Sequence, residues 1–229
     1  GCERAFCAGG DVRSIYEQRR RDLEAMRPFF TTEYHLNRFL FHFKKPYIAL
    51  LNGLTLGGGV GISLNGSFSV ATENMIWGMP ETKIGFFPDV GASYYLARAP
   101  EMIGWYLALS GRTIGAAEAY DLKLVNYVVA ADALSAIIPA LQEVQFTDDP
   151  FATVSKVLKT FQQTPETNSL IEYYPVIRRC FSQSSYQEII DALAFEDGQW
   201  CQQLLDDLTA RSPLSLKVTF EQLHRALNM

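Results

Sequence analysis

The chain has 229 residues, 48% of them hydrophobic, and a net charge of −5. A chain of this length buries roughly 70% of its unfolded surface, which is enough for one large domain or two small ones. Its acidic balance argues against a general nucleic-acid binder, because no positive field dominates. Without a run of about 18 consecutive apolar residues, the sequence predicts no membrane span.

The first part of the chain predicts alternating helices and strands. Asp11 is placed to cap a helix over about 12–26, and a second helix over about 28–43 ends before Pro46. The apolar run from Tyr47 to Leu51 is short and continuous, which is typical of a buried strand. Further along we expect helices over about 57–65, 90–98 and 101–109 and strands over about 67–72, 75–77 and 126–129. This alternation indicates an α/β fold.

From about residue 147 onward the pattern predicts helices alone. Asp149-Pro150 and Ser212-Pro213 are typical helix starts, and apolar residues follow each of them at helical spacing. We therefore expect two parts, an α/β core over 1–146 and a helical C-terminal region over 147–229.

The cysteines and histidines do not predict a metal or redox site. The four cysteines, at positions 2, 7, 180 and 201, contain no Cys-x-x-Cys pair, and a reducing compartment is expected. Cys7 is interpreted as a packing residue beside Phe6 rather than as a nucleophile. The three histidines lack metal-ligand spacing, so no metal is expected.

Two glycine turns are the strongest local signals. One is Ala8-Gly9-Gly10-Asp11, and the other is the Gly-Gly-Gly-Val-Gly run over 57–61, which has neither the P-loop lysine nor the dinucleotide spacing. Both are expected to open helices, whose first N–H groups are free and carry partial positive charge. Two such ends aimed at one point would stabilise a developing oxyanion.

Two carboxylates follow prolines shortly afterwards. Glu81 lies among apolar and aromatic residues, where desolvation would raise its pKa and suit it to proton transfer; the alternative is a loop carboxylate paired with Lys83. Asp89 would cap a helix that begins near Val90, orient a substrate hydroxyl, or do both. Glu33, by its residue pattern alone, is an ordinary helix carboxylate.

Together these motifs resemble the crotonase (enoyl-CoA hydratase/isomerase) superfamily. The resemblance rests on Ala-Phe-Cys-Ala-Gly-Gly-Asp at 5–11, Lys-Pro-Tyr-Ile-Ala at 45–49 and the glycine run at 57–61. The string Met-Pro-Glu-Thr-Lys-Ile-Gly-Phe-Phe-Pro-Asp-Val-Gly at 79–91 is similar to the 3-hydroxyisobutyryl-CoA hydrolase branch. The resemblance is dense from about residue 5 to 129 and thinner beyond.

The resemblance implies roles for particular residues. The oxyanion hole would use the backbone N–H groups of Gly10 and Gly58, and the Ala8–Asp11 loop would lie near the adenine of coenzyme A. The catalytic glutamate would be Glu81. The hydrolase branch would add Asp89 as a further catalytic residue and Glu33 as a substrate contact.

One position separates this chain from the hydratases of the superfamily. Hydratases carry a second glutamate two residues after the glycine triplet, where this chain has Gly61. Hydration of a double bond uses two carboxylates around one water, so the glycine disfavours that reaction.

The resemblance implies a crotonase-like ββα spiral core followed by the helical C-terminal region. Members of the superfamily have several strands before the first glycine turn, including a basic segment that helps hold coenzyme A, and this sequence does not contain them. We therefore expect a core without those strands. Trimers are common in the superfamily, so a homo-oligomer is expected, with the helical region at its interface.

The expected activity is hydrolysis of a short 3-hydroxyacyl-CoA thioester, specifically 3-hydroxyisobutyryl-CoA in valine catabolism. Coenzyme A enters as part of the substrate, and no other cofactor, nucleic acid or membrane is expected. The alternatives are an enoyl-CoA hydratase or isomerase, and a non-catalytic acyl-CoA-binding or assembly fragment. The compartment is expected to be the mitochondrial matrix in a eukaryote or the cytoplasm in a bacterium.

Overall fold

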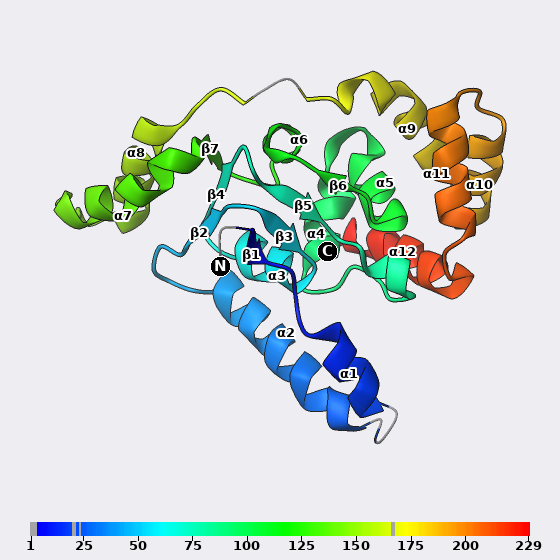
Figure 1. Cartoon of the computed structure of the whole chain (residues 1–229), viewed down its shortest axis with the longest axis horizontal. Coiled ribbons are helices and arrows are strands. Elements are labelled where there is room, and N and C mark those ends of the chain that lie inside the picture. Colours follow the sequence, from blue (N-terminus) through cyan, green and yellow to red (C-terminus); the bar gives the residue numbers. More distant parts are fainter. Residues whose placement is uncertain (1–3, 20–21, 23, 166–167) are drawn as a thin grey trace.

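The computed structural model describes residues 4–19, 22, 24–165 and 168–229. Its strands form two small sheets at the centre of the molecule (Figure 1). The first sheet has the order β1-β3-β5-β6, and only the β5–β6 pair is antiparallel. The second has the order β2-β4-β7 and is entirely parallel. The strands are β1 (Ala5–Cys7), β2 (Ile48–Leu51), β3 (Leu54–Leu56), β4 (Phe68–Thr72), β5 (Ile76–Gly78), β6 (Thr113–Ile114) and β7 (Tyr127–Val129).

Two of the helices in the first third begin at the predicted glycine turns. The Asp11 side chain accepts a hydrogen bond from Ser14 N at 3.0 Å, which caps α1 (Val12–Arg19). The prediction that this helix extends to residue 26 is wrong, because α1 ends at Arg19 and a separate 3₁₀ turn follows at Glu24–Met26. Next come α2 (Arg27–Phe41) and then α3 (Gly58–Leu64), which begins directly after Gly57.

The middle of the chain departs most from the sequence prediction. The helix expected from residue 90 begins two residues later, as α4 (Ala92–Arg98). Pro100 opens a 3₁₀ turn at Pro100–Met102 ahead of α5 (Ile103–Ser110). Strands β1, β3 and β6 and the helices α6 (Ala116–Asp121) and α7 (Leu134–Glu143) were not predicted.

Beyond residue 147 the regular elements of the described chain are all helical, as predicted. They are α8 (Pro150–Phe161), a 3₁₀ turn at Ile171–Tyr173, α9 (Tyr174–Phe181), α10 (Tyr186–Ala194), α11 (Gln199–Thr209) and α12 (Pro213–Ala226). The predicted caps are present. Asp149 accepts from Ala152 N, and Ser212 accepts from Ser215 N.

The buried apolar residues form two clusters. The larger one joins the first sheet to α4, α5 and the helices α9–α12, with Trp77, Leu107 and Ile177 all fully buried in it. The smaller one lies between the second sheet and the helices α7 and α8, on the opposite side of the molecule from α10 and α11 (Figure 1). The division of the chain after residue 146 stays a prediction.

Three of the four cysteines lie in the described part of the chain and are unpaired. Cys180 and Cys201 are buried and Cys7 is half-buried, whereas Cys2 lies outside the described residues. Across the described residues, no helix is both long and apolar enough to cross a bilayer.

Leu107 provides a test of the larger core. It is fully buried in α5, which packs against α9, α11 and α12. We expect Leu107→Ala to lower the free energy of unfolding by about 2–5 kcal/mol, because it removes buried methyl groups and leaves a cavity. The measurement is urea unfolding followed by circular dichroism.

The matched control is Leu214→Ala, because this leucine is 72% exposed. It should change the free energy of unfolding by less than about 0.5 kcal/mol. Equal effects of the two substitutions would contradict the packing described for α5.

Candidate active site

Three parallel strands deliver the predicted site residues to one edge of the first sheet. β1 leads into Gly9 and Gly10, β3 leads into Gly57 and Gly58, and β5 leads through Met79 and Pro80 into Glu81. Because these strands are neighbours in the order β1-β3-β5 and run parallel, their carboxyl ends lie side by side. The topology therefore brings together residues that are more than 70 positions apart in the sequence.

The two glycine turns touch each other. A Cβ atom placed on Gly9 would lie 3.2 Å from the backbone N of Gly58, and one placed on Gly58 would lie 3.7 Å from the backbone N of Gly10. A Cβ on Gly10 would overlap the ring of Phe29. The predicted donors at residues 10 and 58 are thus neighbours, and side chains at these positions would push the two turns apart.

Glu81 lies at the start of a 3₁₀ turn (Glu81–Ile84), beside the second glycine turn. Its side chain is buried, with 8% of the residue exposed, and its Oε1 lies 2.8 Å from where a Cβ of Gly57 would be. Its Oε2 is buried without a hydrogen-bond partner. Glu81 makes no ion pair with Lys83, so the loop-carboxylate alternative is not what the structure contains.

Burial raises the pKa of Glu81 to about 8. A backbone hydrogen bond lowers this pKa by a smaller amount, and the charges of Asp89 and Glu33 raise it further. The side chains of Trp77 and Met79, which precede it in the chain, have no exposed surface. The carboxyl group can therefore exchange a proton near neutral pH, as expected of a general acid or base.

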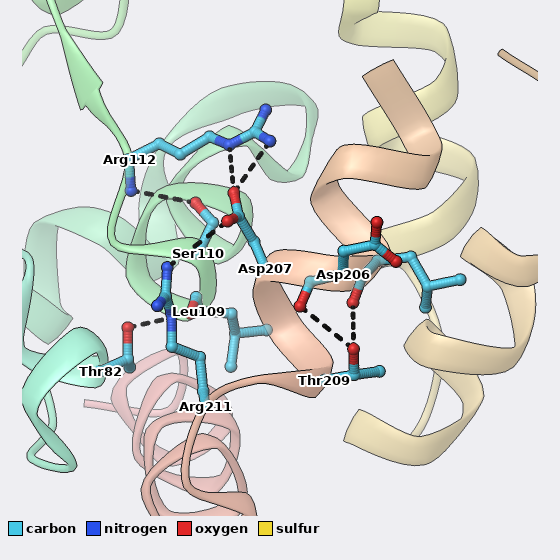
Figure 2. A network of polar contacts seen from close by, with 9 residues as sticks. Thr82, Leu109, Ser110, Arg112, Asp206, Asp207, Thr209 and Arg211 are labelled. Carbon is cyan, nitrogen blue, oxygen red and sulfur yellow. Dashed lines mark hydrogen bonds and ion pairs between the residues drawn. The ribbon is translucent and has the colours of Figure 1, made fainter. Parts of the chain in front are cut away.

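Contacts from the end of α5 hold the Glu81 segment in place, and α11 is joined to the loop that follows α5. Thr82 Oγ1 donates to the carbonyl of Leu109 at 3.0 Å, and Gly111 packs so closely that an added Cβ would lie 3.2 Å from Pro80 Cα. Figure 2 shows the adjoining network, in which Arg112 Nε and Nη2 both donate to Asp207 Oδ2 of α11 at 3.2 and 3.0 Å. The helical C-terminal region is therefore fastened next to the segment that carries the buried glutamate.

Asp89 does not cap the following helix. Its backbone carbonyl accepts from Ala92 N at 2.8 Å, while its side-chain Oδ2 accepts from the hydroxyl of Tyr34 at 2.8 Å. Burial raises the pKa of Asp89, and the Tyr34 hydrogen bond opposes this rise. The carboxylate is thus oriented by a side chain of α2 that the sequence did not single out.

The turn that carries Asp89 is strained and held from two sides. Val90, a β-branched residue, has φ 46°, a conformation that costs such residues of order 1–3 kcal/mol. Asn65 Nδ2 donates to the Val90 carbonyl at 2.9 Å. From α12, Gln222 Nε2 donates to the Pro88 carbonyl at 3.0 Å, and Ser215 Oγ donates to the carbonyl of Phe86. Sequence reasoning missed these supports, because they come from residues far away in the chain.

Glu33 reaches the same place from α2. Its Oε1 lies 2.6 Å from where a Cβ of Gly58 would be, and burial followed by the charge of Asp89 raises its pKa. Glu33, Glu81 and Asp89 thus form a group of three carboxylates around the paired turns. Ala8 is exposed beside these turns, and the Asp11 side chain is engaged as the α1 cap.

Position 61 leaves no room for a glutamate side chain in addition to Glu81. A Cβ at this position would lie 2.5 Å from Val90 Cβ and 3.0 Å from Asn37 Oδ1. Cβ contacts under 3.0 Å require the neighbouring atoms to shift, so a full glutamate side chain does not fit here without rearrangement.

A cavity of about 510 Å³ adjoins this group, between α2, α4 and α12, with Tyr34 and Asp89 in its wall. Within the described residues, no three or more His, Cys, Asp or Glu side chains are arranged to hold a metal ion. The site therefore offers backbone donors, one buried carboxyl group of raised pKa and an adjoining pocket. These groups can polarise a carbonyl and transfer a proton beside it.

Comparison with known proteins identifies relatives over nearly the whole chain. The family model described as "Enoyl-CoA hydratase/isomerase" matches residues 1–229. A Xenopus tropicalis protein named "3-hydroxyisobutyryl-CoA hydrolase, mitochondrial" is 37% identical over 99% of this chain. A Neurospora crassa protein named "Small ribosomal subunit protein mS47" is 37% identical over 96% of this chain. The chain spans 60% and 47% of these two relatives.

The fold likeness extends over the whole chain. The crystal structure of a carnitinyl-CoA dehydratase from Mycobacterium thermoresistibile matches with a TM-score of 0.90 and 34% sequence identity. The match covers 100% of this chain and 65% of that structure.

The raised pKa of Glu81 predicts a pH-dependent stability. The folded-state pKa of about 8 lies above the ordinary value of 4.5, so the protonated carboxyl favours the folded state. This contribution is complete below about pH 4.5 and is lost as the pH rises through 8. We expect Glu81→Gln to gain roughly 2–4 kcal/mol of unfolding free energy relative to the wild type between pH 5 and pH 8.

The measurement is urea unfolding of both proteins across this pH range. Glu33 and Asp89 are present in both proteins, so the difference between the two reports the titration of Glu81 together with its coupling to these two carboxylates. Parallel stability curves would show that Glu81 titrates normally and would contradict the burial described for it.

Proposed function

The chain belongs to the enoyl-CoA hydratase/isomerase family, and within it we propose that the protein hydrolyses the thioester of a short 3-hydroxyacyl-CoA. The proposed substrate is 3-hydroxyisobutyryl-CoA of valine catabolism, and the products are the free 3-hydroxy acid and coenzyme A. The observation that carries this proposal is the placement of one buried glutamate, Glu81, beside the paired glycine turns, with no space for a second glutamate at Gly61. The name of the Xenopus tropicalis relative supports the same reaction.

In the proposed mechanism the backbone N–H groups of Gly10 and Gly58 donate to the thioester carbonyl oxygen. They stabilise the negative charge that develops there, and each such donor is worth about 3–4 kcal/mol in the transition state. The neighbouring positions of these two residues support this assignment.

Glu81 acts on the carbonyl carbon by one of two routes. As a base it takes a proton from water, whose oxygen forms the new bond to carbon while the bond to sulfur breaks. As a nucleophile its carboxylate displaces the thiolate to form an anhydride, which water then hydrolyses. In either route the departing thiolate leaves as coenzyme A after it gains a proton. Asp89 and Glu33 orient the hydroxyl of the acyl chain and the side of the substrate that carries the departing thiolate. The Ala8–Asp11 loop lies near the adenine of coenzyme A.

We propose no other cofactor. A homo-oligomer is the proposed assembly, with the 147–229 region at its interface and the 1–146 region as the catalytic core. We also propose the mitochondrion as the compartment in a eukaryotic source, because the Xenopus tropicalis relative is named mitochondrial.

A non-catalytic role is the second candidate. The observation that favours it is the 37% identity to the Neurospora crassa protein whose name places it in a ribosomal subunit. In that role the chain would act as a component of an assembly, and turnover would be absent.

Thiol release tests the proposed function. We expect the purified chain to release a thiol from 3-hydroxyisobutyryl-CoA, and Glu81→Gln to lower kcat/KM by about 10²–10⁴-fold, because the amide can neither accept the proton nor attack the carbonyl carbon. The reaction is followed with a thiol-reactive chromophore. The control variant is Glu143→Gln, an exposed glutamate of α7 that should leave the rate unchanged.

Equal rates for Glu81→Gln and the wild type would remove Glu81 from the mechanism. Loss of the conjugated absorbance of crotonyl-CoA, without thiol release, would favour a hydratase. Calorimetric binding of coenzyme A without turnover of either thioester would favour the non-catalytic role.

A further inference from the structure

Asn37 of α2 is a buried amide that has no partner. The residue is 6% exposed, and neither its Nδ2 nor its Oδ1 makes a hydrogen bond to any residue that the structure describes. A buried polar group without a partner costs about 1–3 kcal/mol, and such groups are rare in native proteins. A water molecule or a ligand group would supply the partner that the described residues do not.

The position of Asn37 relates it to the candidate active site. It follows Glu33 by four residues in α2, so both side chains lie on the same face of the helix. Glu33 faces Gly58 of α3, and Asn37 Oδ1 lies 3.0 Å from where a Cβ of Gly61 would be. Asn37 therefore lies one helical turn beyond Glu33, where α2 packs against α3.

Asn37 also lines the cavity of about 510 Å³ that adjoins Asp89. The same wall contains Tyr34, whose hydroxyl holds Asp89, and the apolar surfaces of Val90 and Phe87. The cavity lining has one carboxylate, Asp89, and one exposed guanidinium, Arg38, so the charges of its wall balance. A small neutral group with both apolar and hydroxyl character fits this lining.

The other two side-chain amides in the wall are already engaged. Asn65 Nδ2 donates to the carbonyls of Gly61 and Val90, at 2.7 and 2.9 Å. Gln222 Nε2 donates to the carbonyl of Pro88 at 3.0 Å. Asn37 is thus the amide of this wall whose nitrogen and oxygen are both buried without a partner among the described residues.

We propose that Asn37 is a specificity-determining residue that binds the hydroxyl group of the acyl chain. The inference rests on the proposed function and adds to it the group that distinguishes a hydroxyacyl from a plain acyl thioester. The amide Nδ2 donates to the hydroxyl oxygen, and the hydroxyl proton is donated to Asp89. An unpaired amide then gains its partner only when a hydroxylated substrate is bound, and a substrate without the hydroxyl leaves it unpaired.

The test is a comparison of two substrates that differ by one oxygen atom. The ratio of kcat/KM for 3-hydroxyisobutyryl-CoA to that for isobutyryl-CoA is measured in the wild type and in Asn37→Leu. We expect the substitution to lower this ratio about tenfold or more, because only the hydroxylated substrate loses a hydrogen bond. If the wild type is active and Asn37→Leu has the same ratio, the role of Asn37 is overturned and the proposed function is left intact.

A stability measurement separates this role from a structural one. Asn37→Leu removes an unpaired amide, so we expect it to keep or raise the melting temperature of the substrate-free protein. The matched control is Asn168→Leu, because Asn168 is 4% exposed but fully engaged with Asp121, Tyr174 and the N–H of Leu170, and its loss should lower the melting temperature. An equal loss in both variants would mean that the Asn37 amide is paired within the fold, which would overturn the proposal. No thiol release from either thioester by the wild type would instead overturn the proposed function, and the hydroxyl role with it.

Discussion

The parallel pairing of β1 with β3 is the constraint on which the site depends. Ala5 pairs with Leu54 and Cys7 with Thr55, so both strands end at the same level of the sheet. Each strand is followed at once by a glycine turn, and the two turns approach so closely that neither has room for a Cβ facing the other. Backbone N–H groups from two distant segments meet here because the residues between them carry no side chains. The pairing of β3 with β5 then fixes the position of Glu81 relative to the glycine turn that follows β3.

The electrostatics follow from that arrangement. Glu81 is buried by the close approach of β5 and the glycine turns, and burial is the largest cause of its raised pKa. Glu33 and Asp89 arrive from α2 and from a strained turn, and their charges act in the same direction. Burying these carboxyl groups and straining the turn at Val90 lowers the free energy of unfolding. The larger core, which α4, α5 and the C-terminal helices form, supplies the stability that offsets this loss. A hydrogen bond to the end of α5 then holds the segment that carries Glu81, and α12 holds the turn that carries Asp89.

The sequence predicted the parts of the site that local chemistry determines. The helix starts at the two glycine turns and the helix caps at Asp11 and Asp149 depend on neighbouring residues, and these predictions are confirmed, whereas the predicted cap at Asp89 is wrong. Strands β1, β3 and β6 contain only two or three residues and were missed, whereas the equally short β5 and β7 were predicted, so strand length alone does not decide which strands one sequence reveals. Tyr34 and Gln222 looked like ordinary helix residues. Their role depends on which helix face meets the Asp89 turn, which is a tertiary property that one sequence does not reveal.

Gly61 and Asn37 can be understood together. A side chain at position 61 would collide with Val90 and with the Asn37 amide, so the glycine and the buried amide occupy the space that a second carboxylate would need. A neutral amide in that space cannot activate water as a carboxylate does, but it can both donate and accept a hydrogen bond. The proposed recognition of a hydroxyl by Asn37 therefore uses the space that a carboxylate at position 61 would need. Asn37 has no hydrogen-bond partner among the described residues, and this spare capacity is what our proposal assigns to the substrate hydroxyl.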